Sequence, residues 1–193
     1  MAMDTFMLKR INYAWRVVAT GFCFTLFGIG GLLLTLTVFP FLTILPVNTQ
    51  WKKEKAQWII HISFRLFVWL MQIVGVMHLT IKGAEKLRQG GNHLIIANHP
   101  TLIDVVILIS LLPKVDCIVK QGLWRNPFLR GVVISAGYIS NSNSSPQSLM
   151  DDCIATLQQG HSLIIFPEGT RTTPNKPMKF QRGDQFWFRN RIK

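Results

Sequence analysis

The chain has 193 residues, 49% of them hydrophobic, and its 21 lysines and arginines against 9 acidic residues give a formal net charge of +12. This length is enough for one domain with its own core and a further segment. The positive charge favours a phosphate-bearing partner, either a nucleic acid or an anionic membrane surface. The apolar content favours the membrane, and since no nucleic-acid recognition motif accompanies the charge, we expect no nucleic-acid partner.

A long apolar segment comes first in the chain. No charged residue lies between Arg16 and Lys52, and nearly every side chain from Val17 to Phe39 is apolar or small. As a helix this stretch would rise about 34 Å, against a hydrocarbon core of roughly 30 Å. It lacks a signal-peptide cleavage site, so we predict a retained membrane segment. Basic residues on both sides give no orientation, and a full span and a re-entrant hairpin are equally compatible.

A second helix is predicted after a loop. Pro40 and Pro46 are expected to end the first helix, because proline removes a backbone hydrogen bond. The helical pattern that follows, residues 51–77, is apolar except for one narrow polar stripe. The stripe consists of Glu54, Gln57, His61, Arg65 and Gln72. Arg65 at mid-bilayer would cost roughly 2.5 to 3.5 kcal/mol, so we expect this helix to lie in the interface or to pack on the first helix.

From residue 78 onward, short apolar runs alternate with helical patterns. The expected strands are 78–83, 92–98, 116–120, 137–140 and 162–167, and the expected helices are 101–112 and 145–160. Ser145 is the expected N-cap of the second helix and Gly160 its stop. This alternation predicts an α/β fold with a mostly parallel sheet flanked by helices. We therefore divide the chain into membrane-associated N-terminal helices, 1–77, forming a membrane-inserted hairpin, and an α/β domain, 78–193.

Two motifs follow strands of this sheet, where reactive groups gather in parallel α/β folds. In "NHPTLID", His99 precedes a helix that Thr101 can cap, and Asp104 falls in its first turn, where the helix dipole keeps a carboxylate ionised. A carboxylate beside the ring would fix its tautomer and stabilise the imidazolium. A loop histidine and an ordinary first-turn acid would give the same spacing, so the spacing alone is a weak signal.

The second motif, "FPEGTR", spans Phe166 to Arg171. Pro167 and Gly169 favour a turn, the glycine lets a ligand approach the backbone, and Arg171 offers donors suited to phosphate. By itself the motif is as compatible with a structural turn as with an anion site. Its position downstream of the histidine motif, on a basic and apolar chain, favours the anion site.

Both motifs, in this order, resemble those of the glycerolipid acyltransferases, whose members include the 1-acylglycerol-3-phosphate acyltransferases. The similarity covers most of residues 78 to 183 and includes Lys120, Pro127 and Gly131 between the two blocks. The resemblance implies direct acyl transfer from a thioester on coenzyme A or acyl carrier protein to a lipid hydroxyl, with no bound cofactor. No G-x-S-x-G elbow or activated cysteine is present, so a covalent acyl-enzyme is not favoured.

The resemblance also implies roles for particular residues. His99 would take the proton of the acceptor hydroxyl, and Asp104 would orient His99. The acceptor's glycerol-phosphate would be bound by Glu168, Gly169, Thr170 and Arg171, with Arg171 on the phosphate. Lys120 either meets a phosphate or is simply solvated. The expected partners are membrane lipids, the acyl donor and a lysophospholipid, at the inner (plasma) membrane with the catalytic domain on the cytoplasmic face.

The cysteines and the remaining histidines show no pattern that indicates catalysis or metal binding. The cysteines Cys23, Cys117 and Cys153 form no disulfide or metal pattern, and we expect buried thiols in a reducing compartment. The histidines His61, His78, His93 and His161 lack metal-ligand spacing, so we expect no metal site and interpret them as solvated or packing residues.

Two departures from the family pattern leave alternatives open. Tyr138 and Ile139 are followed by Ser140 and Asn141, where the family usually has an acidic residue and an arginine. This leaves room for another lysolipid or a hydroxylated acyl acceptor in place of 1-acylglycerol 3-phosphate. After Gly183 the family's further helix and strand do not follow, so we expect a C-terminally incomplete domain, and an inactive membrane-associated remnant is the second hypothesis.

Overall fold

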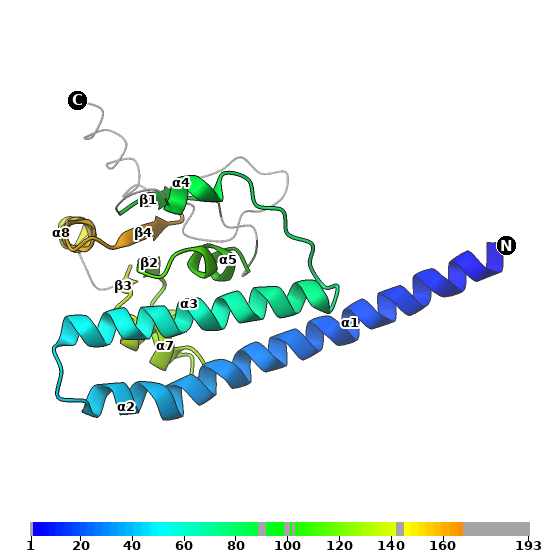
Figure 1. The fold of residues 1–193 in the computed structure, drawn as a ribbon, viewed down its shortest axis with the longest axis horizontal. Coiled ribbons are helices and arrows are strands. Elements are labelled where there is room, and N and C mark those ends of the chain that lie inside the picture. The colour runs from blue at the N-terminus through cyan, green and yellow to red at the C-terminus, as the bar shows by residue number, and fades with distance from the viewer. Residues whose placement is uncertain (1, 89–91, 99–100, 102, 142–144, 168–193) are drawn as a thin grey trace.

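The computed structural model describes residues 2–88, 92–98, 101, 103–141 and 145–167. Figure 1 shows a long helical rod below a second long helix, and an α/β unit above that second helix. The N-terminal part of the rod projects well beyond the rest of the molecule (Figure 1). The chain thus places its two long helices on one side and its sheet on the other.

The first rod is longer than the sequence predicts. It comprises α1 (Ala2–Leu33), a π-helix, η1 (Leu34–Val38), and α2 (Phe39–Ile44). The prediction that Pro40 ends the helix is wrong, because the wider π-turn precedes it and Pro40 falls in the first turn of α2, where a missing N–H is tolerated. The rod does end before Pro46, as expected.

The second long helix is α3 (Thr49–Ile73), and Asn48 caps it by accepting a hydrogen bond from the Trp51 N–H at 2.7 Å. Its polar stripe is directed at the α/β unit, where Gln57 and His61 are buried together with the apolar side of the helix. α3 packs mainly against α5 and α7, described below, and also against α2. The stripe therefore joins α3 to the α/β unit.

α3 also contacts the first rod, as predicted. The ring of Phe27 lies 5.7 Å from that of Phe64 and 5.1 Å from that of Phe67, measured between centroids. Farther along, the indole N–H of Trp15 donates to the carbonyl of Val74 at 3.1 Å. Aromatic packing and this hydrogen bond hold the two long helices together.

The α/β unit contains a four-stranded parallel sheet in the order β1-β4-β2-β3, which confirms the predicted fold class. The strands are β1 (Leu94–Ile96), β2 (Val115–Val119), β3 (Ile139–Ser140) and β4 (Ser162–Ile165). The helices are α4 (Ala84–Arg88), α5 (Ile103–Leu111), α6 (Gly122–Arg125), α7 (Arg130–Ser135) and α8 (Pro146–Gln158). As predicted, the Ser145 side chain caps α8 by accepting from the Ser148 N–H at 3.2 Å, and Gly160 follows its end at φ +80°.

Both faces of the sheet are covered. Ile164 belongs to a core shared with α3, α5 and α7, whereas its neighbours Leu163 and Ile165 pack with α8 on the opposite face. Alternating residues of one strand point to opposite faces, so two-sided burial explains the continuous apolar runs. The predicted strand at 78–83 is wrong: this segment forms no strand, and the apolar side chains of Leu79 and Ile81 line a cavity over α3.

Two helices are long and apolar enough to cross a membrane, by length and composition alone: Met7–Ile44 and Thr49–Ile73. Only 17% of the first helix's most apolar window is buried, and exposed aromatic and aliphatic residues such as Trp15, Phe22 and Phe41 run along it. A core helix of a soluble protein would be largely buried. An apolar surface of this kind favours association with a membrane or another protein.

Glycines allow the rod to approach the α/β unit closely. A Cβ on Gly31 would lie 2.7 Å from the carbonyl oxygen of Phe128, and a Cβ on Gly131 would lie 2.4 Å from side-chain atoms of Thr35. Both distances are far below van der Waals contact. Gly31, from the "FGIGG" stretch, therefore serves close packing between the rod and the α7 region.

Gly131→Ala is expected to lower the free energy of unfolding by about 1 to 3 kcal/mol, because overpacking outweighs the roughly 1 kcal/mol that alanine gains in a helix. Thr35 is short and β-branched, so it cannot swing away from the added methyl group. Gly122→Ala is the matched control, since it is also helical and no heavy atom lies within 4 Å of its Cβ position. Thermal unfolding in detergent compares the two, and equal midpoints would contradict this contact.

Candidate active site

The ends of β1 and β4 bring the two motif blocks to one edge of the sheet. These strands are parallel neighbours with Ile96 opposite Ile165, and the Ala97 N–H extends the pairing by donating to the Ile165 carbonyl at 3.1 Å. His99 comes three residues after Ile96, and Glu168 comes three residues after Ile165. His99 and Glu168, Gly169, Thr170 and Arg171 lie outside the described residues. The described strands β1 and β4 nevertheless end side by side, so both motif blocks leave the sheet at adjacent positions of its carboxyl edge. Parallel sheets carry their active sites at this edge.

Asp104 is held at the start of α5. Its Oδ2 accepts a hydrogen bond from the Thr101 N–H at 2.6 Å, and its Oδ1 accepts one from the Thr101 hydroxyl at 3.0 Å. The predicted position in the first helical turn is confirmed. The Thr101 hydroxyl was predicted to cap the helix, but it donates its hydrogen bond to the Asp104 carboxylate. The two hydrogen bonds to Thr101 thus give the aspartate a defined orientation at the start of α5.

Lys120 lies on the same carboxyl edge. It follows β2, which pairs with β4, and its side chain is exposed while its backbone carbonyl accepts from the Leu123 N–H at 3.0 Å. Asn141, directly after β3, extends that edge by donating from its N–H to the Val119 carbonyl at 3.1 Å. The predicted role of Lys120 in substrate binding stays a prediction, but its strand places it beside the "FPEGTR" strand.

The cysteines supply no reactive thiolate in the α/β unit. Burial raises the pKa of Cys117 to about 12, with a further contribution from Asp116. Burial, followed by the charges of Asp152 and Asp116, also raises the pKa of Cys153 to about 12. Both thiols, like that of Cys23, are free and buried. In the part of the chain that the structure describes, no three histidine, cysteine or acidic side chains are grouped to hold a metal ion.

The sequence profile of the family described as "Acyltransferase" matches residues 78–188, more than half of the chain. This chain belongs to the acyltransferase family. The match covers both motif blocks and the whole described sheet, so the fold and the positions of the blocks agree with the resemblance seen in the sequence.

Several curated relatives carry the name 1-acyl-sn-glycerol-3-phosphate acyltransferase. The protein from Cocos nucifera is 28% identical over 129 residues, which are 64% of this chain and 40% of the relative. The Helicobacter pylori protein is 35% identical over 85 residues, 42% of this chain and 36% of the relative. The Borreliella burgdorferi protein is 28% identical over 123 residues, 62% of this chain and 48% of the relative. The chain thus spans less than half the length of these relatives.

A solved structure has the same fold. The crystal structure of the 1-acyl-sn-glycerophosphate acyltransferase PlsC from Thermotoga maritima aligns with a TM-score of 0.63 at 18% sequence identity. The alignment covers 90% of this chain and 67% of the PlsC chain. Because the alignment takes in 90% of this chain, it includes at least part of the N-terminal helices as well as the α/β unit.

Sequence reasoning missed a buried polar cluster at the opposite, amino edge of the sheet, where β2 and β4 begin. Asp116 is fully buried, and its Oδ1 lies 3.0 Å from the Lys53 ammonium and accepts from the Gln57 amide at 3.2 Å. Its Oδ2 lies 3.1 Å from Nδ1 of His161, which is also fully buried. The Gln57 amide also donates to the carbonyl of Ala136 at 3.0 Å.

This Asp116 cluster joins α3 to the sheet. Two of its side chains, Lys53 and Gln57, come from α3, and the Lys53 stem passes over Gly137, whose φ of +65° and missing Cβ leave room for it. Beside it, Nε2 of His161 lies 2.9 Å from the Gln50 amide nitrogen. The signal in the sequence was the α3 stripe, which faces protein and not the membrane interface.

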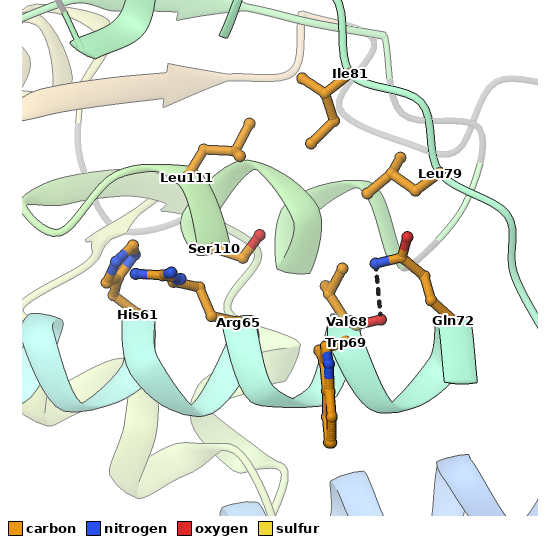
Figure 2. Close-up of a pocket in the computed structure, with 9 residues that line it drawn as sticks. All are labelled: His61, Arg65, Val68, Trp69, Gln72, Leu79, Ile81, Ser110 and Leu111. Carbon is orange, nitrogen blue, oxygen red and sulfur yellow. Dashed lines mark hydrogen bonds between the residues drawn. The ribbon is translucent and has the colours of Figure 1, made fainter. Parts of the chain in front are cut away.

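The same stripe continues into a cavity. Figure 2 shows His61, Arg65 and Gln72 of α3 facing α5 and the segment that carries Leu79 and Ile81. The cavity has a volume of about 640 Å³. No residue of either motif block lines it in the described part of the chain. The sequence interpretation of His61 as a packing residue is therefore incomplete.

Proposed function

We propose that this chain is a membrane-bound acyltransferase that moves a fatty acyl group from a coenzyme A or acyl-carrier-protein thioester to 1-acylglycerol 3-phosphate, giving phosphatidate. The observation that carries the proposal is the β1–β4 register, which starts both motif blocks from one sheet edge in a chain of the acyltransferase family. The substrate is suggested by the relatives, which are named as acyltransferases of 1-acyl-sn-glycerol 3-phosphate.

In the proposed reaction, His99 removes the proton of the acceptor hydroxyl as the hydroxyl oxygen attacks the thioester carbonyl carbon. The new C–O ester bond forms and the C–S bond breaks. The proton that His99 carries then passes to the departing thiolate, so the enzyme returns to its starting state. Positioned general bases of this kind typically contribute about 100- to 10,000-fold to a rate.

The roles of the other site residues follow from their chemistry. Asp104, fixed by its two hydrogen bonds to Thr101, orients the imidazole and stabilises its protonated form. Arg171 binds the acceptor's phosphate, with Glu168, Gly169 and Thr170 around the glycerol. Lys120, on the neighbouring strand end, adds positive charge beside the phosphate.

The two apolar helices support a location at the membrane. A site held at the interface receives acceptor and product without extracting either lipid into water, and basic residues near the surface contribute about 1 kcal/mol each on anionic lipid. The acyl donors are carried by water-soluble thiols made inside the cell, which favours the cytoplasmic face of the inner (plasma) membrane.

One observation favours a different acceptor. Ser140 ends β3 and Asn141 follows it on the same edge as the motif blocks, where the resemblance leads one to expect an acid and an arginine. A neutral pair offers fewer contacts to a phosphate monoester. The second candidate function is therefore acylation of another lysolipid or a hydroxylated acyl acceptor.

A panel of acceptors distinguishes these functions. The full chain is reconstituted in vesicles with a labelled acyl thioester and one of three acceptors: lysophosphatidate, lysophosphatidylcholine or monoacylglycerol. We expect lysophosphatidate to be acylated at least about 10-fold faster than monoacylglycerol, because losing a charged partner of Arg171 costs at least about 1.5 kcal/mol. Equal rates for these two acceptors would refute recognition of the phosphate, and a preference for lysophosphatidylcholine would support the second function.

A further inference from the structure

The cavity between α3, α5 and residues 77–81 has the size and lining of a ligand site. Its volume of about 640 Å³ falls in the range of roughly 300–1,000 Å³ that is typical of small-molecule sites. Its walls are formed by His61, Arg65, Val68, Trp69, Gln72, Leu79, Ile81, Ser110 and Leu111 (Figure 2). Polar groups gather on α3 and apolar side chains face them from the crossing segment, so the lining is amphipathic.

The charge of this lining is positive. Arg65 is the only permanently charged side chain among the lining residues, and no carboxylate lines the cavity within the described part of the chain. No ion pair to Arg65 is found among the described residues. In Figure 2 its guanidinium extends along α3 toward the His61 ring, one helical turn away. A guanidinium that faces a cavity without a carboxylate favours an anionic occupant.

His61 is held in a fixed position in the cavity wall. Its ring is 7% exposed, and its Nδ1 lies 2.8 Å from the carbonyl oxygen of Ile109. Because a carbonyl oxygen only accepts, Nδ1 carries the hydrogen, and the ring is held in one orientation. Nε2 is then the nitrogen left to meet a ligand: it accepts from a protonated phosphate or, when the ring is protonated, donates to an ionised one.

The apolar part of the cavity leads to the outer surface of the long helices. Trp69 is 56% exposed and Ile81 is 43% exposed, although both line the cavity. Leu66 and Ile73, on either side of Trp69 along α3, are exposed as well. A ligand with an apolar chain would therefore stay in contact with the surface that the proposed membrane location covers with lipid.

We propose that this cavity binds an anionic membrane phospholipid, with its phosphate on Arg65 and His61 and an acyl chain against Val68, Leu79 and Leu111. Charge complementarity selects the headgroup, and the exposed Trp69 wall selects an amphiphile over a free phosphate ion. The site is separate from both motif blocks in the described chain and goes beyond the proposed reaction. The bound lipid would contact both α3 and residues 77–81. Anionic lipid in the membrane would therefore stabilise the packing of the α/β unit on its helices.

Photolabelling of the detergent-solubilised full chain tests this site. The probe is a phosphatidate with a diazirine in one acyl chain, and the comparison probe is a diacylglycerol with the same chains. We expect phosphatidate to label residues 77–81 and the α5 end at Ser110–Leu111, and diacylglycerol to label them at least about 10-fold less, because diacylglycerol lacks the charged group that would accept hydrogen bonds from Arg65. Excess unlabelled phosphatidate should compete, and excess phosphatidylcholine should compete more weakly.

Variants on α3 sharpen the test. Arg65→Gln should lower labelling by about 10-fold or more, Arg65→Lys should retain part of it, and Lys55→Gln, on an exposed part of the same helix, should leave it unchanged. Equal labelling by diacylglycerol, or wild-type labelling of a folded Arg65→Gln chain, would overturn the proposal. If Arg65→Gln fails to fold, the comparison of the two probes on the wild-type chain still decides. His99→Ala should keep the labelling, so an absence of acyl transfer and an absence of lipid binding are separate results.

Discussion

His99→Ala is expected to lower acyl transfer by about 100- to 10,000-fold, which is the usual contribution of a general base. Without the imidazole, the acceptor hydroxyl must attack the thioester while still protonated, and water is the only base left. We expect no described residue to replace His99 in this role, because the role proposed for the second motif block is anion binding and burial raises the pKa of Cys117 and Cys153 to about 12. Initial rates in vesicles, at saturating acyl donor and lysophosphatidate, measure the effect.

His78→Gln is the matched control for this variant. His78 is exposed and lies outside both motif blocks, so its replacement should leave the rate within about twofold of the wild type, as surface substitutions usually do. Lipid association and the thermal midpoint are measured for both variants, since a loss of folding would imitate a loss of catalysis. A folded His99→Ala chain that turns over as fast as His78→Gln would exclude His99 as the base.

Asp116→Asn is expected to lower the free energy of unfolding by about 3 to 5 kcal/mol, the range found when one member of a buried ion pair is removed. The asparagine amide has nearly the shape of the carboxylate but no charge. Lys53 and His161 would then each face either the amide NH2, which is itself a donor, or the uncharged amide oxygen. Lys53 is 19% exposed at its side chain and so retains some contact with water, which favours the lower end of this range. Because two of the cluster's members come from α3, the loss should also loosen that helix from the sheet.

Denaturant unfolding compares Asp116→Asn with Asp152→Asn. Asp152 is an exposed residue of α8, and its replacement should change the free energy of unfolding by no more than about 0.5 kcal/mol. The Lys53→Met variant and the double variant complete a cycle, which should show a coupling of about 0.5–3 kcal/mol for partners in direct contact. A loss no larger than that of Asp152→Asn would mean that the Asp116 cluster does not stabilise the fold.

Local patterns predicted the four described strands and the helices α5 and α8, but gave no prediction for the short helices α4, α6 and α7. The runs around Ile95, Cys117 and Ile164 were predicted as strands because buried parallel strands are apolar on both faces. The Ser145 cap and the Gly160 stop were predicted from local turn chemistry. The wrong predictions depended on tertiary structure. Residues 78–83 have strand propensity, but they cross over the cavity. Pro40 is accommodated after a π-turn that no local sequence pattern predicts.

The candidate site was predicted only in part, and for a physical reason. A short motif predicted the chemistry proposed for His99 and Asp104, and in the structure Asp104 is held at the start of α5 by Thr101. The Asp116 cluster and the Arg65 cavity were missed because their members are far apart in sequence. The polar stripe of α3 gave a signal, but the partners of Gln57 and His61, which are Asp116 and the carbonyl of Ile109, become neighbours only once the sheet and α5 have formed.

The most direct test of the proposed acyl transfer follows both halves of the product at once. The full chain in vesicles receives a thioester labelled in its acyl group and lysophosphatidate labelled in its phosphate, and the lipids and the released thiol are quantified together. The proposed reaction gives a single phosphatidate product that carries both labels in equal amounts and appears at the same rate as the free thiol. Thiol release with the acyl label in free fatty acid, or no doubly labelled lipid from a folded and membrane-bound chain, would contradict it.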